Sequence, residues 1–469
     1  MNTKKNATPL TTRKRFIGGM LAAGAAPTIV PSSVFGANAP SNRITLAGVG
    51  VGGIGYSQLQ DCRNAGFEVI ALCDLDWTYA KRTFDLFPGA RLYKDYREML
   101  RTEADKADAI YCGCPDHWHT LVTLAALGAK KHVCCVKPLT RKVDECRAVV
   151  AAAKKAGTAT QVTACTSNDE ASVRLYEILD AGLLGEVTEV AAWSRRPVWP
   201  QGMAELPDWE DPIPDGFDWD MWCGPAKRVP FASKWGKHAP YEKLSKEAWC
   251  GDAVYHPFNF RGWFEYGAGA LGDMGCHRAN TIYRALDLKW PTRVEASSSR
   301  VSAVAFPLSS IVTYDYATCK YGHPVRLTWY DGGLLPPTPK AAGSYSLPKE
   351  GVLYYGTKGV VLFDAMKPLD CKLVFFDKAL EAQANALPRT KPRRPGWIYG
   401  EWLEACKGGE AASCNFDFAQ YITEFVQLGN LALQTEKPVE FDPAAMKVTN
   451  GNDAADALLH SHYENGWTF

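Results

Sequence analysis

A glycine-rich turn between an apolar run and a helical stretch most constrains how this chain can fold. The stretch RITLAGVGVGGIGYSQLQ reads as a strand, a turn and a helix, and Gly50, Gly52 and Gly55 give it the pattern G-x-G-x-x-G. This is the setting that a dinucleotide-binding motif requires. The first glycine permits the tight turn, the second lets backbone approach a pyrophosphate, and the third lets helix and strand pack closely. The alternative is a glycine-rich turn without a ligand.

A carboxylate follows at the distance that such a site needs. The next apolar run, FEVIALCD, ends at Asp74, twenty-four positions after Gly50. A carboxylate there accepts hydrogen bonds from the adenosine ribose and repels a 2′-phosphate, which favours NAD over NADP. The glycine pattern also fits Gly48, Gly50 and Gly53, but that register leaves a shorter strand. We therefore predict cofactor contacts from the turn, the helix start and the acid: Gly50, Gly52, Gly53, Ile54, Gly55 and Asp74.

Strand-like and helical stretches continue to alternate as far as residue 165. ADAIYCGC, HVCCV and TATQVTAC read as strands, whereas HTLVTLAALGAKK and KVDECRAVVAAAKKAG read as helices. This alternation predicts an α/β fold with a doubly wound parallel sheet, covered by helices on both faces. We assign residues 41–165 to this Rossmann domain.

The stretch CGCPDHWH, from Cys112 to His119, places two cysteines, two histidines and a carboxylate within eight residues. A zinc site needs four converging ligands, but cysteines in a strand point alternately into the core. Open α/β sheets bind ligands outside the carboxyl ends of their strands, and this loop lies there. We predict cofactor contacts and no metal site, with helix capping as the alternative for the acid. The predicted contacts are Cys114, Pro115, Asp116, His117 and His119.

Several motifs together resemble the Gfo/Idh/MocA family of NAD(P)-dependent oxidoreductases. They are CPDHWHT, KHVCCVKPLT, GALGDMGCH, EWLEACKGG and SCNFDFA, and the resemblance covers nearly all of the chain after residue 41. It implies a second α/β domain, here residues 166–469, built on a large, mostly antiparallel open sheet. It also implies a carbohydrate or polyol substrate and a homo-oligomer, either a dimer or a tetramer.

The same resemblance implies a catalytic set. The family's Glu-Lys-Pro motif is matched by Val136-Lys137-Pro138, and its Asp-x-x-x-His motif by Asp273 and His277. Lys137 would then hydrogen-bond the reacting hydroxyl, His277 would be the general base, and Asp273 would orient substrate or base. A helix places residues four apart on one face, and imidazole is suited to proton abstraction. The alternatives are a helix cap and a buried structural histidine. Val136 stands where the family motif has glutamate, so this chain lacks that carboxylate next to the lysine.

Residues 197–260 are rich in Pro, Trp and Asp and carry few regular signals, which predicts insertions folded over a cleft. Donors and aromatic faces near them are candidates for binding a polyol, with surface or packing roles as the alternative. We predict substrate contacts from Trp193, Arg195, Tyr255, His256 and Asn259, and further cofactor contacts from Lys137, Gln161, Arg261 and Trp263.

Residues 1–39 have the three-part plan of an export signal: a basic start, a mildly apolar stretch and a small-x-small site before residue 40. TRKRFIGG resembles a twin-arginine signal with Lys14 in place of the second arginine, and cleavage is expected near Ala39. This predicts a periplasmic or otherwise exported protein; the alternative is a disordered tail. Removing five basic residues from 52 leaves 47 against 51 acidic ones, a net charge of −4. No basic field favours nucleic acid, and no long apolar run predicts a stable membrane insertion.

The leading hypothesis is an NAD-dependent oxidoreductase, NADP being the less favoured cofactor, that acts on a hydroxyl or ketone of a sugar, glycoside or polyol. An exported protein would lose a freely exchanging cofactor by dilution, so we expect a tightly held one. The first alternative is a glycoside-cleaving enzyme that oxidises, eliminates and reduces with no net redox change. The second is a non-catalytic sensor of cofactor or sugar.

Overall fold

The computed structural model describes residues 43–165, 167–236, 251–299, 302–364, 372–394 and 396–469. The predicted export signal, residues 1–39, lies outside the described residues. In the described part, no helix combines the length and the apolar character that crossing a bilayer requires. Residues Ile44–Phe469 form one compact unit that holds two sheets.

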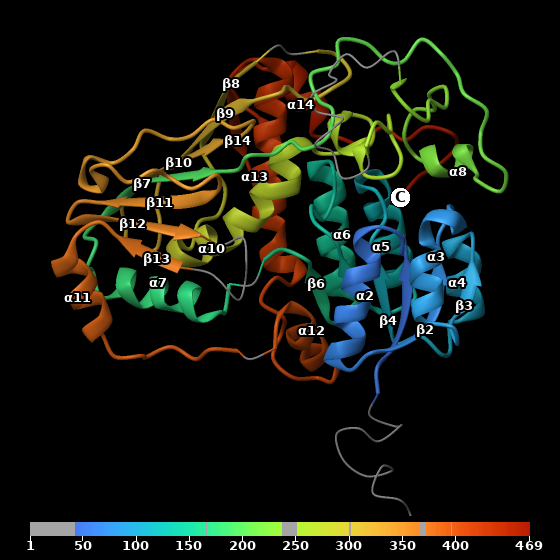
Figure 1. The fold of residues 1–469 in the computed structure, drawn as a ribbon, viewed down its shortest axis with the longest axis horizontal. Helices are drawn as coiled ribbons and strands as arrows, with labels where there is room; N and C mark the ends of the chain where they lie inside the picture. Colours follow the sequence, from blue (N-terminus) through green and yellow to red (C-terminus); the bar gives the residue numbers. More distant parts are fainter. Residues whose placement is uncertain (1–42, 166, 237–250, 300–301, 365–371, 395) are drawn as a thin grey trace, which may run out of the picture. The chain divides into compact units, whose positions relative to one another are not determined.

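The first sheet is parallel and has the strand order β3-β2-β1-β4-β5-β6 (Figure 1). Its central strands are buried on both faces because helices cover both, which confirms the predicted doubly wound sheet. The elements are β1 (Thr45–Val49), α2 (Ile54–Ala65), β2 (Glu68–Cys73), α3 (Trp77–Leu86), β3 (Arg91–Tyr93), α4 (Tyr96–Thr102), β4 (Ala109–Cys112), η3 (Asp116–Trp118), α5 (His119–Gly128), β5 (His132–Cys135), α6 (Val143–Ala156) and β6 (Thr160–Val162).

The second sheet has nine strands in the order β13-β12-β11-β7-β10-β9-β8-β14-β15. Only β7 and β10 pair in parallel, so the predicted mostly antiparallel sheet is confirmed. β11 and β12 form a hairpin in which Gly356 pairs with Gly359. The strands are β7 (Val187–Trp193), β8 (Arg293–Ser298), β9 (Ser310–Tyr316), β10 (Val325–Tyr330), β11 (Gly351–Gly356), β12 (Gly359–Asp364), β13 (Lys372–Phe375), β14 (Val439–Asp442) and β15 (Lys447–Val448).

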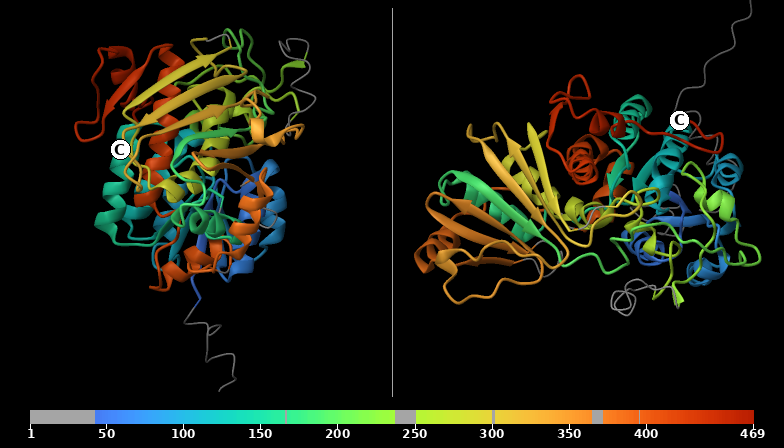
Figure 2. Two further views of the ribbon diagram at one scale, coloured as in Figure 1. Left: turned by 90° about the vertical axis from the view of Figure 1, so that its left-hand side faces the viewer. Right: turned by 90° about the horizontal axis from the view of Figure 1, so that it is seen from above.

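Helices connect and cover the two sheets (Figure 2). The longest, α13 (Phe416–Thr435), packs against α6 of the first sheet and against β8 of the second, and α12 (Ile398–Cys406) packs on α2. The chain thus returns to the Rossmann domain after completing most of the second sheet. The remaining helical elements are α7 (Glu170–Asp180), α8 (Trp219–Cys223), η5 (Asn259–Gly262), η6 (Leu271–Gly275), α10 (Cys276–Leu286), η7 (Lys340–Ala342), α11 (Lys378–Ala386) and α14 (Asp453–Leu458).

Candidate active site

The glycine turn joins β1 to α2 in the way the first register of the motif requires. Gly50 has φ +71°, and a side chain there would overlap the backbone of Cys114. At Gly55 a Cβ would lie 2.8 Å from the carbonyl oxygen of Gly50, so the third glycine lets the helix pack on the turn. The described hydrogen bonds leave the N–H groups of Gly53 and Ile54 without a described acceptor at the start of α2. Such groups suit a pyrophosphate.

Asp74 follows β2 and faces this turn. One carboxylate oxygen accepts the N–H groups of Val51 at 2.8 Å and Gly52 at 2.9 Å, and the other accepts the N–H of Asp76 at 3.0 Å. Burial raises the pKa of Asp74, while these three donors act in the opposite direction. The carboxylate therefore lies beside the second glycine, where the predicted ribose contact would form.

A cleft of about 970 Å³, including space open to solvent, lies at this turn. Its walls come from the ends of β1, β2, β4 and β5 and from residues 221–222 and 256–261. Val136, which stands where the related family has glutamate, adds an apolar side chain to the lining. The predicted cofactor residues that line the cleft are Gly50, Gly52, Gly53, Ile54, Asp74, Cys114, Pro115, Asp116 and Arg261, and the predicted substrate residue His256 lines it too.

His117 and Trp118, in the stretch CPDHWH, fasten the insertion to the Rossmann domain. The indole N–H of Trp118 donates to the carbonyl of Trp222 at 3.0 Å, and Nε2 of His117 lies 2.8 Å from the same oxygen. Burial lowers the pKa of His117 to about 3, so the ring is neutral and carries one N–H. Its other nitrogen lies 3.2 Å from the carbonyl of Tyr266. The structure therefore gives His117 a packing position behind the cleft.

Asp116 and His119 take different positions. Asp116 makes no capping hydrogen bond at the start of α5, so the alternative of a helix cap is wrong; the residue lines the cleft instead. Burial raises the pKa of Asp116, against the attraction of His119, Arg261 and Lys137. His119 is fully buried, with its ring nitrogens 2.7 Å from the carbonyl of Pro138 and 2.9 Å from that of Cys114. It holds the loop after β4 against the segment after β5.

The insertion closes the opposite side of the cleft, as predicted, through further contacts with the Rossmann domain. Nε2 of His256 lies 3.1 Å from a carboxylate oxygen of Asp76, and Nζ of Lys94 donates to the carbonyl of Gly216 at 2.6 Å. The His256 ring stacks on Phe217, with centroids 5.2 Å apart. These contacts fix the insertion beside the adenosine end of the cleft.

Lys137 and Asp273 pair beside Arg261; Arg261 lines the cleft, whereas Lys137 and Asp273 do not. Nζ of Lys137 donates to a carboxylate oxygen of Asp273 at 2.5 Å, although the two residues are 136 positions apart. Nε of Arg261 lies 3.4 Å from the same oxygen, and Nη1 of Arg196 lies 3.5 Å from the second one. Burial raises the pKa of Asp273, but Lys137, Arg261 and Arg196 outweigh it and hold that pKa well below its ordinary range. Asp273 is therefore a carboxylate among three cations.

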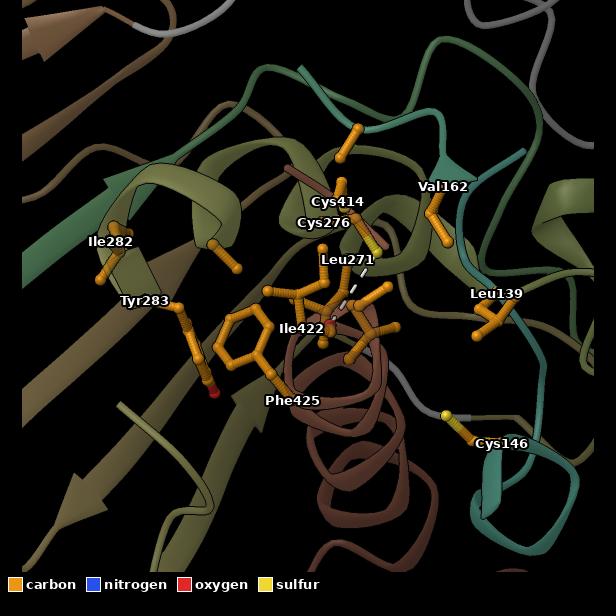
Figure 3. Close-up of a cluster of buried hydrophobic side chains, with 14 of the residues drawn as sticks. Leu139, Cys146, Val162, Leu271, Cys276, Ile282, Tyr283, Cys414, Ile422 and Phe425 are labelled. Atoms are coloured by element: carbon orange, nitrogen blue, oxygen red, sulfur yellow. Dashed lines mark hydrogen bonds between the residues drawn. The ribbon is translucent and has the colours of Figure 1, made fainter. Parts of the chain in front are cut away.

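The backbone that carries Asp273 departs from the expected α-helix. Leu271–Gly275 is a π-helical turn that continues into α10, and π turns are frequent at functional sites. Figure 3 shows Leu271 beside Ile422 of α13, in a buried cluster to which Leu139 and Val162 of the Rossmann domain also belong. Leu271 and Leu139 belong to one buried core, so the segments that carry Asp273 and Lys137 rest on the same support.

His277 lies one turn beyond Asp273, on α10. Its Nδ1 accepts the backbone N–H of Cys165 at 2.9 Å. Burial, together with the nearby Lys137, Arg278 and Arg196, lowers the pKa of His277 to about 3, against the opposing effect of Asp273. The ring is therefore neutral near pH 7. All three predicted catalytic residues come together from two domains.

Other predicted residues lie elsewhere. Trp263 and Tyr255 belong to a buried aromatic cluster, and Trp193 packs in a core on the second sheet. Gln161 accepts the N–H of Cys414 inside the fold, and the side-chain amide of Asn259 donates to the carbonyl of Ala253. Arg195 is half exposed, 3.8 Å from Glu350. The cleft described above includes none of these six: Trp193, Arg195, Tyr255, Gln161, Asn259 and Trp263.

Sequence reasoning missed Arg196, which contacts Asp273, and also Asp76 and Tyr79, which lie beside Asp74 and the glycine turn. Asp76 stands two positions after Asp74 and caps helix α3, a role that the sequence alone could have indicated. Tyr79 lies over the glycines of the turn, because a Cβ at Gly53 would meet its hydroxyl. No local pattern separates Arg196 from its neighbour Arg195.

The thirteen cysteines in the described part of the chain are all free. Among the same residues, no group of three or more His, Cys, Asp and Glu side chains is arranged to hold a metal ion. CGCPDHWH therefore serves, where the structure describes it, as a strand end, a cleft wall and two packing side chains.

Comparison with known proteins supports the resemblance of the first domain and the fold. Residues 44–164 match the family model described as "Oxidoreductase family, NAD-binding Rossmann fold", the Gfo/Idh/MocA model, which confirms the resemblance over the first domain. Inositol 2-dehydrogenase of Salmonella typhimurium is 31% identical over 142 residues, 29% of this chain and 42% of the relative. That of Klebsiella pneumoniae is 33% identical over 147 residues, 30% of this chain and 43% of the relative. The chain thus matches less than half the length of these curated relatives.

Solved structures extend the likeness to both sheets. The WlbA dehydrogenase of Bordetella pertussis, in complex with NADH and UDP-GlcNAcA, has a TM-score of 0.57 and 13% identity, and the match covers 85% of this chain and 99% of that one. The aldose-aldose oxidoreductase of Caulobacter crescentus, complexed with glycerol, has a TM-score of 0.54 and 16% identity, over 85% and 100% of the two chains. At these identities the likeness concerns the fold.

Proposed function

We propose that this chain is an NAD-dependent oxidoreductase of the Gfo/Idh/MocA type, which oxidises a hydroxyl of a sugar, glycoside or polyol to a ketone, or catalyses the reverse. One observation carries the proposal: a single cleft begins at the glycine turn beside Asp74 and reaches Arg261, whose Nε lies 3.4 Å from Asp273. Asp273 in turn holds Lys137 at 2.5 Å. The dinucleotide cleft and the buried lysine–carboxylate pair are thus joined through Arg261, which lines the cleft and contacts Asp273.

The residues present fit a nicotinamide dinucleotide. The N–H groups of Gly53 and Ile54 would bind the pyrophosphate, and Asp74 would accept the adenosine ribose hydroxyls. Asp74 and Asp76 both place carboxylates at that end, which disfavours a 2′-phosphate and supports NAD over NADP. When bound, the nicotinamide supplies the site that accepts or returns a hydride.

The chain's own residues would bind and activate the hydroxyl. Lys137 directly follows Val136, which lines the cleft, and its charge would stabilise an alkoxide that develops on the substrate. Asp273 orients Lys137, and Arg196 and Arg261 fix the carboxylate. The buried position of this group limits water, which strengthens these electrostatic effects.

We also propose that the cofactor is held tightly and recycled within each catalytic cycle. The insertion fastened by His117, Trp118 and His256 lies along the cleft and would slow the release of a dinucleotide. We further propose, from the sequence, that residues 1–39 direct export and that the mature protein is a homo-oligomer. An enzyme that works by oxidation, elimination and reduction would also have to regenerate its cofactor within each catalytic cycle.

A substrate panel tests the proposed function. The purified full-length protein is incubated with NAD and with neutral sugars, polyols, uronates and aryl glycosides, while absorbance at 340 nm and released phenol are recorded. Net reduction of NAD indicates an ordinary dehydrogenase. Phenol release without net reduction indicates the elimination route. Nucleotide binding with turnover of no compound in the panel would contradict the proposed oxidoreductase and favour a sensor.

Matched variants show whether the turnover arises in this site. Lys137→Met should reduce turnover by about 10²-fold or more, because it removes a charge that acts on the developing alkoxide. Lys154→Met changes a lysine that is 65% exposed on α6, and it should leave turnover unchanged. Equal activity in the two variants would contradict the assignment of Lys137.

A further inference from the structure

Residues 464–467, with the sequence Glu-Asn-Gly-Trp, form a tight turn. The N–H of Trp467 donates to the carbonyl of Glu464 at 3.1 Å. Asn465 and Gly466 have φ +59° and +77°, and left-handed backbone at both central positions is what a type I′ turn requires. Asn-Gly is the pair that favours this turn, so the sequence builds it locally and thereby fixes where the side chains on either side of the glycine point.

The turn binds the insertion just after α8 (Figure 1). The side-chain amide of Asn465 donates to the carbonyl oxygens of Gly224 at 2.8 Å and Ala226 at 3.1 Å. The backbone N–H of Glu464 donates to the carbonyl of Pro225, between them, at 2.9 Å. Three successive residues of the insertion are thus held by two adjacent residues of the turn.

The same stretch of chain is also attached to the Rossmann domain. The rings of Trp467 and Trp118 meet edge to face with centroids 4.9 Å apart, and Cζ of Arg97 lies 4.9 Å from the Trp467 ring centroid. Further back, the backbone N–H and the hydroxyl of Ser461 donate to one carboxylate oxygen of Asp144, at 2.7 and 2.9 Å. Residues 461–467, called the strap below, therefore join the insertion to the Rossmann domain.

The two surfaces that the strap joins are also walls of the nucleotide cleft. Trp118 and Trp222 both line the cleft, and the indole N–H of Trp118 donates to the carbonyl of Trp222 at 3.0 Å. Gly224 has φ +50°, and a Cβ there would overlap the Trp118 ring, so the end of α8 lies in close contact with the Rossmann domain. Asn465 binds one side of this contact and Trp467 the other. Moving α8 away from Trp118 therefore breaks the strap contacts as well.

We propose that the strap holds the insertion closed over the nucleotide cleft and so slows release of the cofactor, with Asn465 and Trp467 as positioning residues. This inference rests on the proposed function, because it takes a nicotinamide dinucleotide as the occupant of the cleft. Neither residue lines the cleft, so each acts through α8 or Trp118. Opening of such a wall sets the release rate of a ligand beneath it, and contacts that must break together make opening slower.

The first test needs no nucleotide. Asn465→Asp keeps a residue that tolerates left-handed backbone, but it places a carboxylate against two carbonyl oxygens, so the contact is lost while the turn is kept. In α8 the N–H groups of Trp222 and Gly224 are hydrogen-bonded, which makes opening measurable by hydrogen exchange and mass spectrometry of the full-length protein. Exchange in α8 should become about tenfold faster, with β4 and β5 unchanged. Unchanged exchange in α8 would overturn the proposal.

The second test measures nucleotide release. NADH is bound to the full-length protein and displaced by excess NAD, and the loss of bound NADH fluorescence gives the release rate. Trp467→Ala should speed release by about tenfold, because it removes the aromatic and cation–π contacts, and Trp467→Phe should stay within about threefold of wild type. Trp397→Ala is the matched control: this ring is 43% exposed, contacts Tyr399, and should not affect release.

The outcomes separate this inference from the proposed function. Faster release from Trp467→Ala than from Trp397→Ala, with association rates unchanged, supports the strap. Equal release from these two variants, with NADH bound by both, would overturn the strap and leave the proposed function intact. A wild-type protein that binds no NADH would contradict the proposed function, and the strap proposal would fail with it.

Discussion

Replacing Asp273 with asparagine tests the buried charge cluster in the catalytic centre. Asp273 is 8% exposed and pairs with Lys137, which is 13% exposed, at 2.5 Å. Removing one partner of a buried ion pair leaves a charge without its counter-ion and costs about 3–5 kcal/mol. We therefore expect Asp273→Asn to lower the free energy of unfolding in urea by about that amount at pH 7.

Asp85→Asn is the matched control. Asp85 pairs with Lys81 at 2.7 Å, but both side chains are well exposed, at 64% and 70%. Exposed pairs of this kind contribute about 0.2–1 kcal/mol, so the control should change stability little. The difference between the two variants reports the effect of burial.

A double-mutant cycle isolates the pair itself. If Asp273 and Lys137 act as one unit, adding Lys137→Met to Asp273→Asn removes one of the three cations that lost their counter-ion, and the double variant should be less destabilised than the sum of the two single variants. The expected coupling is about 2–3 kcal/mol. Additive effects, or an Asp273→Asn variant no less stable than Asp85→Asn, would refute the inference that this cluster is held by buried charge pairing.

Other predictions concern the cleft and the second sheet. Gly50→Ala should abolish nucleotide binding in calorimetry, because a side chain at φ +71° would overlap the Cys114 backbone; binding within threefold of wild type would contradict this. His256→Ala should speed the release of bound nucleotide by about tenfold in a dilution assay, since it removes the contact with Asp76; an unchanged rate would argue against a retaining insertion. Burial raises the pKa of Asp331 to about 7, so this acid favours folding in its protonated form and loses that contribution as pH rises from 4 to 7. Asp331→Asn should therefore gain up to about 3 kcal/mol relative to wild type between pH 5 and 8, and a constant difference in urea titrations would contradict this.

The first domain could be predicted because its signals are local. Gly50, Gly52 and Gly55 serve the turn through their own backbone, and Asp74 follows the strand that brings it beside that turn. The alternation of strands and helices then predicts the parallel sheet without reference to distant contacts.

The errors come from contacts that only the folded chain creates. His117 reads as a cleft residue, yet the carbonyl of Trp222, more than a hundred positions away, takes its ring into the core. Arg195 and Arg196 are neighbours of the same type, and only the path after β7 decides that Arg196 reaches Asp273. The π turn at Leu271–Gly275 has no signature in residue spacing, which fits a regular helix as well.

The most direct test of the central claim is the nucleotide content of the purified protein. The full-length chain is purified without added cofactor and denatured, and the released small molecules are identified by mass spectrometry, with calorimetric titration of NAD as the second measurement. The account predicts close to one NAD or NADH per chain, or tight binding of added NAD that Gly50→Ala abolishes. A protein that releases no nicotinamide nucleotide and binds none when it is added would contradict the claim that this cleft is an oxidoreductase active site.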